Sequence, residues 1–375
     1  ALTVCSGDAI GLNFATAPTS VAAVSYDYVG SLPDPGLTAD PGNVLPANTI
    51  MAGYVAGDVF TNTTNIPLNV TYEVRGTAGV TGCVGTSEFI VVTIDPEPVM
   101  NPALNATVCS DEAINVTLAT NGTSVLANGY NLIDVTIPVG LTAGGGNVPF
   151  PAISVVDTYI AGDSYNNQTT GSLVVTYEVQ PESAAGCLGE IELIQVTIDP
   201  EPVINTTLDK TICSDEATAL VLSTNGLSVA ADNYNIIDVT VPAGLTAAGG
   251  NVLIPFAGVA DNYLANDNYN NVTAASIDVI YEVQGVSADG CAGDSEFIII
   301  TIDPEPVLNN GLDVTLCSDE ATGITLNTNG TSVAADNYNI VSVTIPAGLT
   351  GGGSNAPVPA NGVAADYLLN DTFTN

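Results

Sequence analysis

Short runs in which apolar and polar residues alternate recur along the whole chain. They are rich in Val, Ile, Thr and Tyr, and Asn, Gly, Pro and Ser separate them. Alternation with a period of two is typical of strands that bury one face, and no stretch has the 3.6-residue period of a helix. We therefore expect an all-β fold. Between residues 98 and 201 the predicted strands lie at 113–120, 131–138, 153–160, 172–180 and 191–199.

The pattern repeats with a step of 104 residues. Cysteine recurs at this step from Cys5 and again from Cys83, and the phrase Ile-Asp-Pro-Glu-Pro-Val begins at Ile94, Ile198 and Ile302. Such a period means tandem domains of one kind. Short strands in a module of about 100 residues favour an immunoglobulin-like antiparallel β-sandwich. We predict repeat 1 at residues 1–97, repeat 2 at 98–201, repeat 3 at 202–305, and repeat 4, incomplete at its C-terminus, at 306–375.

The segment Asp-Pro-Glu-Pro-Val joins each complete repeat to the next. Two prolines in alternate positions restrict the backbone and stiffen a linker. We therefore expect short, semi-rigid joints and an extended rod.

The cysteines form a regular framework. Each complete repeat has one cysteine near its start and one 78 residues later. Paired cysteines indicate an oxidising, extracellular setting, and zinc is disfavoured because the chain has no His and no CxxC. If the first cysteine precedes the first strand, it lies beside the loop before the last strand; if it begins the second strand, the pairing changes. The first arrangement predicts the bonds Cys5–Cys83, Cys109–Cys187 and Cys213–Cys291, with Cys317 unpaired because repeat 4 stops before its partner position.

The charge is strongly one-sided. Asp and Glu total 40, while Arg75 and Lys210 are the basic residues, which gives a net charge of −38. Such a chain cannot neutralise phosphates, so nucleic acid is excluded as a partner and an anionic membrane surface is disfavoured. No apolar run is long enough for insertion into a membrane. A Ser-His-Asp triad is impossible without His, and identical carboxylate pairs in every repeat are unusual for a glycosidase, so we expect no enzyme.

Carboxylates gather on both sides of each joint. If the end of one repeat meets the start of the next, four acidic side chains converge there without basic neighbours. Calcium prefers carboxylate oxygens, so it is the one cofactor this pattern suggests; the alternative is a set of solvated turn carboxylates. The three candidate groups are Asp95, Glu97, Asp111 and Glu112; Asp199, Glu201, Asp215 and Glu216; and Asp303, Glu305, Asp319 and Glu320.

Two further patterns concern single side chains. Tyr72, Tyr177 and Tyr281 share a Tyr-Glu-Val context on the penultimate strand, where each is either a tyrosine corner bonded to the backbone or an ordinary strand tyrosine with a wet hydroxyl. Glycosylation is a second expectation, because Asn-X-Ser/Thr sequons are frequent. They lie at Asn62, Asn69, Asn105, Asn115, Asn121, Asn167, Asn205, Asn271, Asn329 and Asn370.

The repeat resembles the PKD-like and related immunoglobulin-like repeats of large secreted surface proteins in the Bacteroidota. The resemblance rests on Val4–Asp8, Thr61–Thr64, Val70–Val74, Gly82–Gly85 and Val92–Pro98. It implies an extracellular, cell-surface stalk, adhesin or filament. The chain lacks Trp and the Trp-Asp-Phe-Gly-Asp-Gly run of the PKD family proper, so we expect a sandwich variant.

These features favour a structural repeat region, a stalk or filament shaft that self-associates or displays other parts of a surface protein. The alternative is a module that binds glycans or surfaces multivalently. That alternative predicts an exposed aromatic residue in the same loop of every repeat, and the candidates are Tyr130, Tyr234 and Tyr338.

Overall fold

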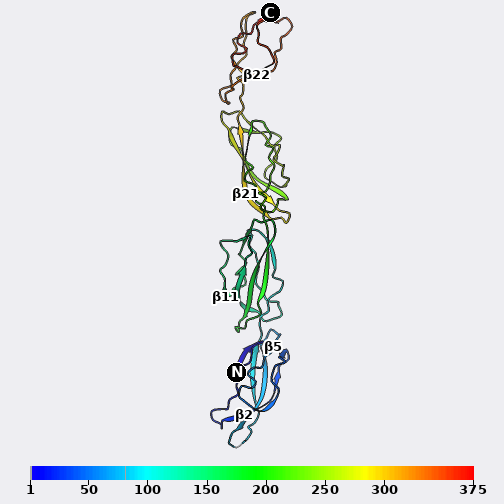
Figure 1. Ribbon diagram of the computed structural model, residues 1–375, viewed down its shortest axis with the longest axis vertical. Coiled ribbons are helices and arrows are strands. Elements are labelled where there is room, and N and C mark those ends of the chain that lie inside the picture. The colour runs from blue at the N-terminus through cyan, green and yellow to red at the C-terminus, as the bar shows by residue number, and fades with distance from the viewer. Residues whose placement is uncertain (1, 81) are drawn as a thin grey trace. The chain divides into compact units, whose positions relative to one another are not determined.

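A computed structural model describes residues 2–80 and 82–375. The described residues form strands and loops and contain no helix, which confirms the all-β class (Figure 1). They therefore also contain no helix that could cross a membrane. The chain divides into two compact units, Ala1–Asn167 with Gly171–Asp199, and Gln168–Thr170 with Pro200–Asn375.

Repeat 1 has one five-stranded sheet in the order β1-β7-β6-β2-β4 and a two-stranded sheet of β3 and β5. Neighbouring strands are antiparallel, except that β1 runs parallel to β7 and places Cys5 beside Asp95. The bounds are β1 Leu2–Cys5, β2 Ala23–Pro33, β3 Leu37–Ala39, β4 Ala47–Ile50, β5 Phe60–Asn62, β6 Leu68–Ala78 and β7 Glu88–Asp95.

The same arrangement recurs in repeats 2 and 3, with strand orders β11-β9-β13-β14-β8 and β15-β21-β20-β16-β18. Repeat 2 contains β8 Ala106–Cys109, β9 Ala127–Thr136, β10 Leu141–Ala143, β11 Ala152–Val155, β12 Tyr165–Asn167, β13 Leu173–Ser183 and β14 Glu192–Asp199. Repeat 3 contains β15 Lys210–Cys213, β16 Asn233–Thr240, β17 Leu245–Ala247, β18 Phe256–Val259, β19 Tyr269–Asn271, β20 Ile277–Val286 and β21 Ala292–Asp303.

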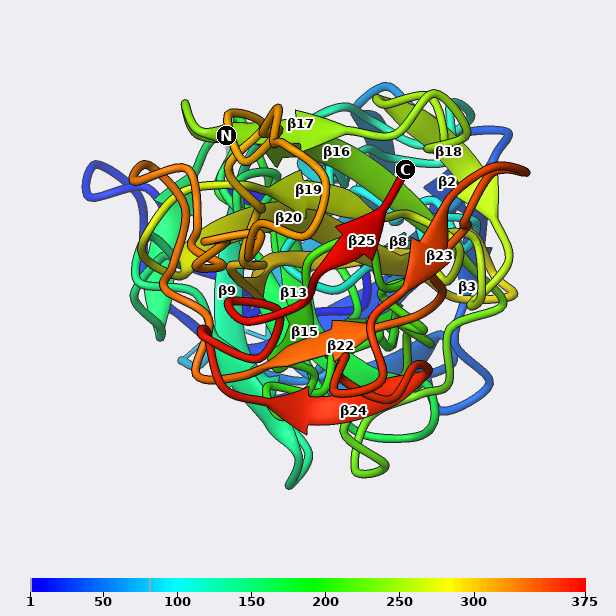
Figure 2. The same ribbon diagram turned by 90° about the horizontal axis from the view of Figure 1, so that it is seen from above.

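Repeat 4 has two short antiparallel pairs, β22 with β24 and β23 with β25 (Figure 2). Their bounds are β22 Tyr338–Ile340, β23 Thr350–Gly351, β24 Ala360–Val363 and β25 Phe373–Thr374. Leu326 is its one buried large apolar side chain among the described residues. The described residues of repeat 4 form no equivalents of the central strands β20 and β21.

Each complete repeat encloses its own apolar core. In β13 the side chains of Val175, Tyr177 and Val179 are fully buried, as the alternating pattern predicts. The run 113–120 also buries its apolar positions, but it is not a regular strand. Its backbone bonds instead to the turn before β12, through Ile114 N–H to Asp163 O at 2.8 Å. The cores confirm a tandem array of β-sandwiches.

Candidate functional site

A disulfide bond joins Cys5 at the end of β1 to Cys187 in the loop between β13 and β14. The two Cα atoms are 5.5 Å apart and the residues are separated by 182 positions. The bond therefore connects repeat 1 to repeat 2, beside the peptide linker that already joins them.

The predicted pairing within each repeat is wrong. Cys5 bonds to Cys187, which removes both Cys5–Cys83 and Cys109–Cys187, and the thiol of Cys213 is free and exposed, which removes Cys213–Cys291. Cys109 and Cys291 are both disulfide-bonded, and Cys317 is free, as predicted.

The direction of β1 explains the error. Cys5 ends β1 and lies beside Asp95 at the C-terminal end of β7, whereas Cys83 precedes the N-terminal end of that strand. An eight-residue strand is about 25 Å long, far more than the roughly 7 Å that a disulfide allows between Cα atoms. Cys5 is thus placed where the chain leaves repeat 1, within reach of the next repeat.

Hydrogen bonds to Ser183 hold the loop that carries the buried residue Cys187. Ser183 donates its N–H to the Cys187 carbonyl at 2.8 Å, and its hydroxyl accepts the Cys187 N–H at 3.1 Å. Gly186 has φ +83°, a left-handed conformation that glycine adopts without strain. Ser287 holds Cys291 with the same two contacts, at 2.8 and 3.1 Å. The receiving loop is therefore the same in repeats 2 and 3.

The acidic motifs at the start and at the end of one repeat lie close together. In repeat 3, Asn270 Nδ2 donates to Asp215 Oδ2 at 2.9 Å and to Glu305 Oε1 at 3.0 Å. These residues follow β15 and β21, which are parallel neighbours, so their following turns lie side by side. At the first joint, burial raises the pKa of Glu97, and the charges of Asp8 in repeat 1 and Glu190 in repeat 2 raise it further.

The predicted four-carboxylate groups are not seen among the described residues. Within residues 2–80 and 82–375, no three acidic, cysteine or histidine side chains are placed to hold a metal ion. Several of these carboxylates accept hydrogen bonds from the protein itself. Ser172 donates to Asp199 and Ser276 to Asp303, each at 2.6 Å, and the Cys213 N–H donates to Glu216 at 3.1 Å. Calcium binding therefore stays a prediction for Asp95, Glu97, Asp111, Glu112, Asp199, Glu201, Asp215, Glu216, Asp303, Glu305, Asp319 and Glu320.

A buried aspartate beneath the sheet is a feature that the sequence reasoning missed. In repeat 2, Asp163 Oδ2 accepts the Tyr177 hydroxyl at 3.0 Å, and Oδ1 accepts the Val148 N–H at 2.8 Å. Tyr165 adds a hydroxyl contact to Tyr177 at 2.7 Å. Burial raises the pKa of Asp163, while its two hydrogen bonds act in the opposite direction. Burial is also the largest cause of the raised pKa of Tyr177.

This aspartate–tyrosine pair recurs as Asp58 with Tyr72 and as Asp267 with Tyr281. The tyrosine hydroxyl therefore bonds to a buried carboxylate, which neither sequence interpretation anticipated. A sequence signal was available in Tyr-X-(Ala/Leu)-(Gly/Asn)-Asp-X-(Phe/Tyr), which ends on the aromatic residues 60, 165, 269 and 373. The pair fixes the loop before the short second sheet to the main sheet.

Three of the sequon asparagines are structural. Asn62 has 5% of its surface exposed, and Asn167 and Asn271 have none. Asn271 Nδ2 donates to Ala275 O at 3.0 Å and to Ile302 O at 2.8 Å, which occupies the nitrogen that a glycan would need. These three positions are therefore excluded as glycosylation sites.

The aromatic residues proposed for ligand binding are not exposed in a common loop. Tyr130 lies on β9 and Tyr234 on β16, and both are buried, while Tyr338 on β22 is half-buried. Exposed aromatic side chains do occur at Phe89 and Phe297, but the equivalent residue of repeat 2 is Leu193. No described position carries an exposed aromatic residue in all three complete repeats.

Residues 210–306 match the model of the PKD-like domain family. No curated protein sequence matches the chain. Among solved structures, the human desmocollin-1 ectodomain is 10% identical, with 99% of this chain and 72% of that chain covered and a TM-score of 0.22. The chicken CNTN1 FN1–FN3 domains are 11% identical, with 80% and 98% covered and a TM-score of 0.25.

A third similar structure is the Bacteroides ovatus mixed-linkage glucan utilization locus protein SGBP-B in complex with a mixed-linkage heptasaccharide. It is 12% identical, with 84% of this chain and 69% of that chain covered and a TM-score of 0.14. All three TM-scores are low, so no functional conclusion follows from these likenesses.

Proposed function

We propose that this chain is the structural repeat region of an extracellular surface protein, a stalk or filament shaft whose consecutive repeats are cross-linked by disulfides. The carrying observation is the Cys5–Cys187 bond, because it ties two repeats together covalently where a single peptide linker would otherwise bear every load. The domain bounds 1–97, 98–201, 202–305 and 306–375 belong to this proposal.

The bond supports both the setting and the role. A disulfide persists in oxidising compartments, which favours an extracellular location. A second covalent connection beside a proline-containing linker restricts the rotation of one repeat against the next. That restriction has little use in a catalyst, but it keeps a shaft stiff under tension.

The charge and the side-chain network fit the same role. A net charge of −38 keeps such a shaft soluble and disfavours nucleic acid as a partner. Polar groups inside the sandwiches bond to one another, as in the Asp163–Tyr177 pair. The glycan-binding alternative has lost its sequence support, since Tyr130 and Tyr234 are buried.

Small-angle scattering of the whole oxidised chain tests this proposal. A single compact body of this length would have a radius of gyration of about 21 Å, and a shaft must exceed that value well. A value near 21 Å would refute the shaft. Saturable binding to a glycan array would support the alternative instead.

A further inference from the structure

In repeats 2 and 3 the linker becomes part of the repeat that follows it. Met100 and Ile204 have only 3% and 2% of their surface exposed, and each packs into the core of that repeat. Met100 forms an antiparallel bridge with Thr120. The linker therefore adds a short extended strand to one end of the sandwich.

The backbone contacts of this inserted strand are the same in each case. In repeat 2, Asn101 N–H donates to Ala119 O and Asn121 N–H donates to Val99 O, both at 2.9 Å, while Val99 N–H donates to Ser124 Oγ at 3.0 Å. In repeats 3 and 4, Val203 and Val307 donate to the equivalent serine hydroxyls at 2.9 and 3.0 Å. A serine thus marks the place where the strand enters.

A glycine makes room for the strand. A Cβ atom on Gly189 would lie 1.9 Å from Pro98 O, and one on Gly293 would lie 1.9 Å from Pro202 O. No side chain is compatible with so close an approach of two backbones. In repeat 1 the equivalent residue is Gly85, where the nearest atom to a Cβ would be Gly76 O at an ordinary 3.5 Å.

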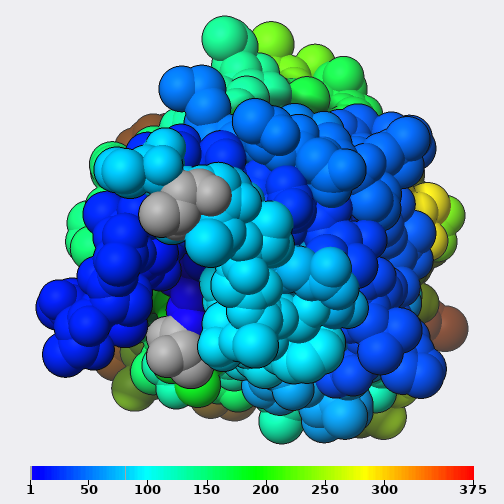
Figure 3. All heavy atoms as spheres, turned by 90° about the horizontal axis from the view of Figure 1, so that it is seen from below, coloured from blue at the N-terminus to red at the C-terminus, as the bar shows by residue number. Residues whose placement is uncertain are grey.

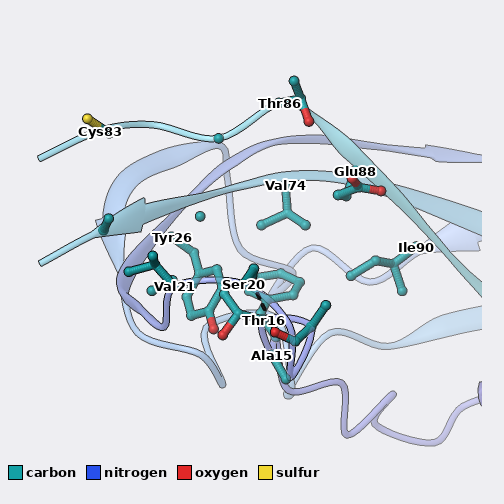
Figure 4. Close-up of a pocket in the computed structure, with 16 residues that line it drawn as sticks. Ala15, Thr16, Ser20, Val21, Tyr26, Val74, Cys83, Thr86, Glu88 and Ile90 are labelled. Atoms are coloured by element: carbon teal, nitrogen blue, oxygen red, sulfur yellow. Dashed lines mark hydrogen bonds between the residues drawn. The ribbon is translucent and has the colours of Figure 1, made fainter.

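Repeat 1 has an open pocket at this place. It has a volume of 710 Å³, and its lining includes Gly76 and Gly85. Figure 4 shows the side chains of Thr16, Ser20, Tyr26, Val74, Glu88 and Ile90 around it. A space-filling view of this end shows a recess between blue and cyan side chains of the repeat (Figure 3). The Ser20 hydroxyl donates to Ala17 O at 3.0 Å, so its oxygen can still accept a hydrogen bond from an N–H.

We infer that this pocket is a socket for an extended peptide strand of the type Pro-Val-apolar-Asn, supplied by the end of another repeat of this kind. The apolar side chain fills the space between Tyr26, Val74 and Ile90. The strand pairs with the edge at Ala15–Ala17, as peptides do when they extend a sheet. Its proline carbonyl passes over Gly85. Residues 98–101, 202–205 and 306–309 already occupy the corresponding place in the other repeats.

Calorimetric titration of the full chain with a synthetic peptide of residues 96–103 tests the socket. We expect saturable binding with one site per chain. A matched peptide with Asp in place of Met100 should bind at least about tenfold more weakly, because its charge would be buried against Tyr26 and Val74 in a pocket that Glu88 also lines. Equal binding of both peptides, or no binding of either, would overturn the inference.

Gly85→Ala provides the matched protein variant. The empty pocket accepts the added methyl group, so the thermal unfolding midpoint should not change, whereas peptide affinity should fall at least about tenfold. If Gly85→Ala disturbs folding, Ser20→Ala serves as the second variant. It removes the hydroxyl that accepts the N–H of the peptide, so it should also weaken peptide binding. Unchanged affinity in a folded variant would contradict the socket. A concentration-dependent dimer that Gly85→Ala abolishes would also support the socket, because a repeat of a second copy would then supply the strand.

Discussion

The Cys5–Cys187 bond should limit how far the chain extends under tension. A force applied to the two termini passes from Cys5 through the sulfur atoms to Cys187, so the 182 residue steps between them carry no load. When the disulfide is removed, the residues between Cys5 and Cys187 become part of the load-bearing chain. At about 3.3–3.6 Å per residue, the fully extended chain should become longer by roughly 600–650 Å.

Single-molecule force spectroscopy measures this difference directly. Because Cys109 and Cys291 are also disulfide-bonded, the comparison uses a background in which both are Ser. In that background, the chain with Cys5 and Cys187 intact is pulled under oxidising conditions and again after reduction. The control carries Cys5→Ser in addition, and its length should not depend on reductant.

The result discriminates between the two pairings. A bond between Cys5 and Cys83 would remove only 78 residue steps from the path, or about 260–280 Å. A length gain of that smaller size on reduction, or no gain, would refute a covalent connection between the first two repeats.

Three further outcomes follow from the interior of the repeats. Asp58→Ala leaves the Val44 N–H and the Tyr72 hydroxyl without their acceptor, so the free energy of unfolding of repeat 1 should fall by about 2–4 kcal/mol, measured by hydrogen exchange with repeat 3 as the internal control. Burial raises the pKa of Asp58, so its contribution to stability is greatest below the unfolded pKa of about 3.9 and is lost as pH rises through the folded pKa. The wild type should therefore lose stability relative to Asp58→Asn over that pH window, and parallel curves would contradict the buried carboxylate. Expression in a glycosylating host should leave Asn167 unmodified in a peptide mass map, and a glycan at that position would show that the residue is not buried.

The repeat and the strands were largely predictable, because both depend on local pattern. The run 172–180 alternates without a break, and β13 buries the positions that this alternation assigns to the core. The short strands were missed for the same reason. β8 and β12 have four and three residues, too few for a period to be visible.

The predicted disulfide pairing was wrong because the positions of the cysteines depend on the direction of one strand, β1. Nothing in the four residues of β1 says whether it pairs parallel to β7, yet that pairing decides which end of the sheet carries Cys5. The same parallel pairing places the acidic turns at the start and at the end of one repeat side by side. Asp163 shows a second limit: Gly-Asp in a turn looks solvent-exposed in the sequence, and only the packing of Tyr177 above it makes it buried.

Non-reducing peptide mapping tests the central claim most directly. Cleavage after Glu releases residues 1–73 with Cys5, 74–88 with Cys83, and 183–190 with Cys187. The structure predicts a disulfide-linked pair of fragments 1–73 and 183–190 that separates on reduction. A linked pair of 1–73 and 74–88 would show that each repeat closes its own bond, and the cross-linked shaft would then be wrong.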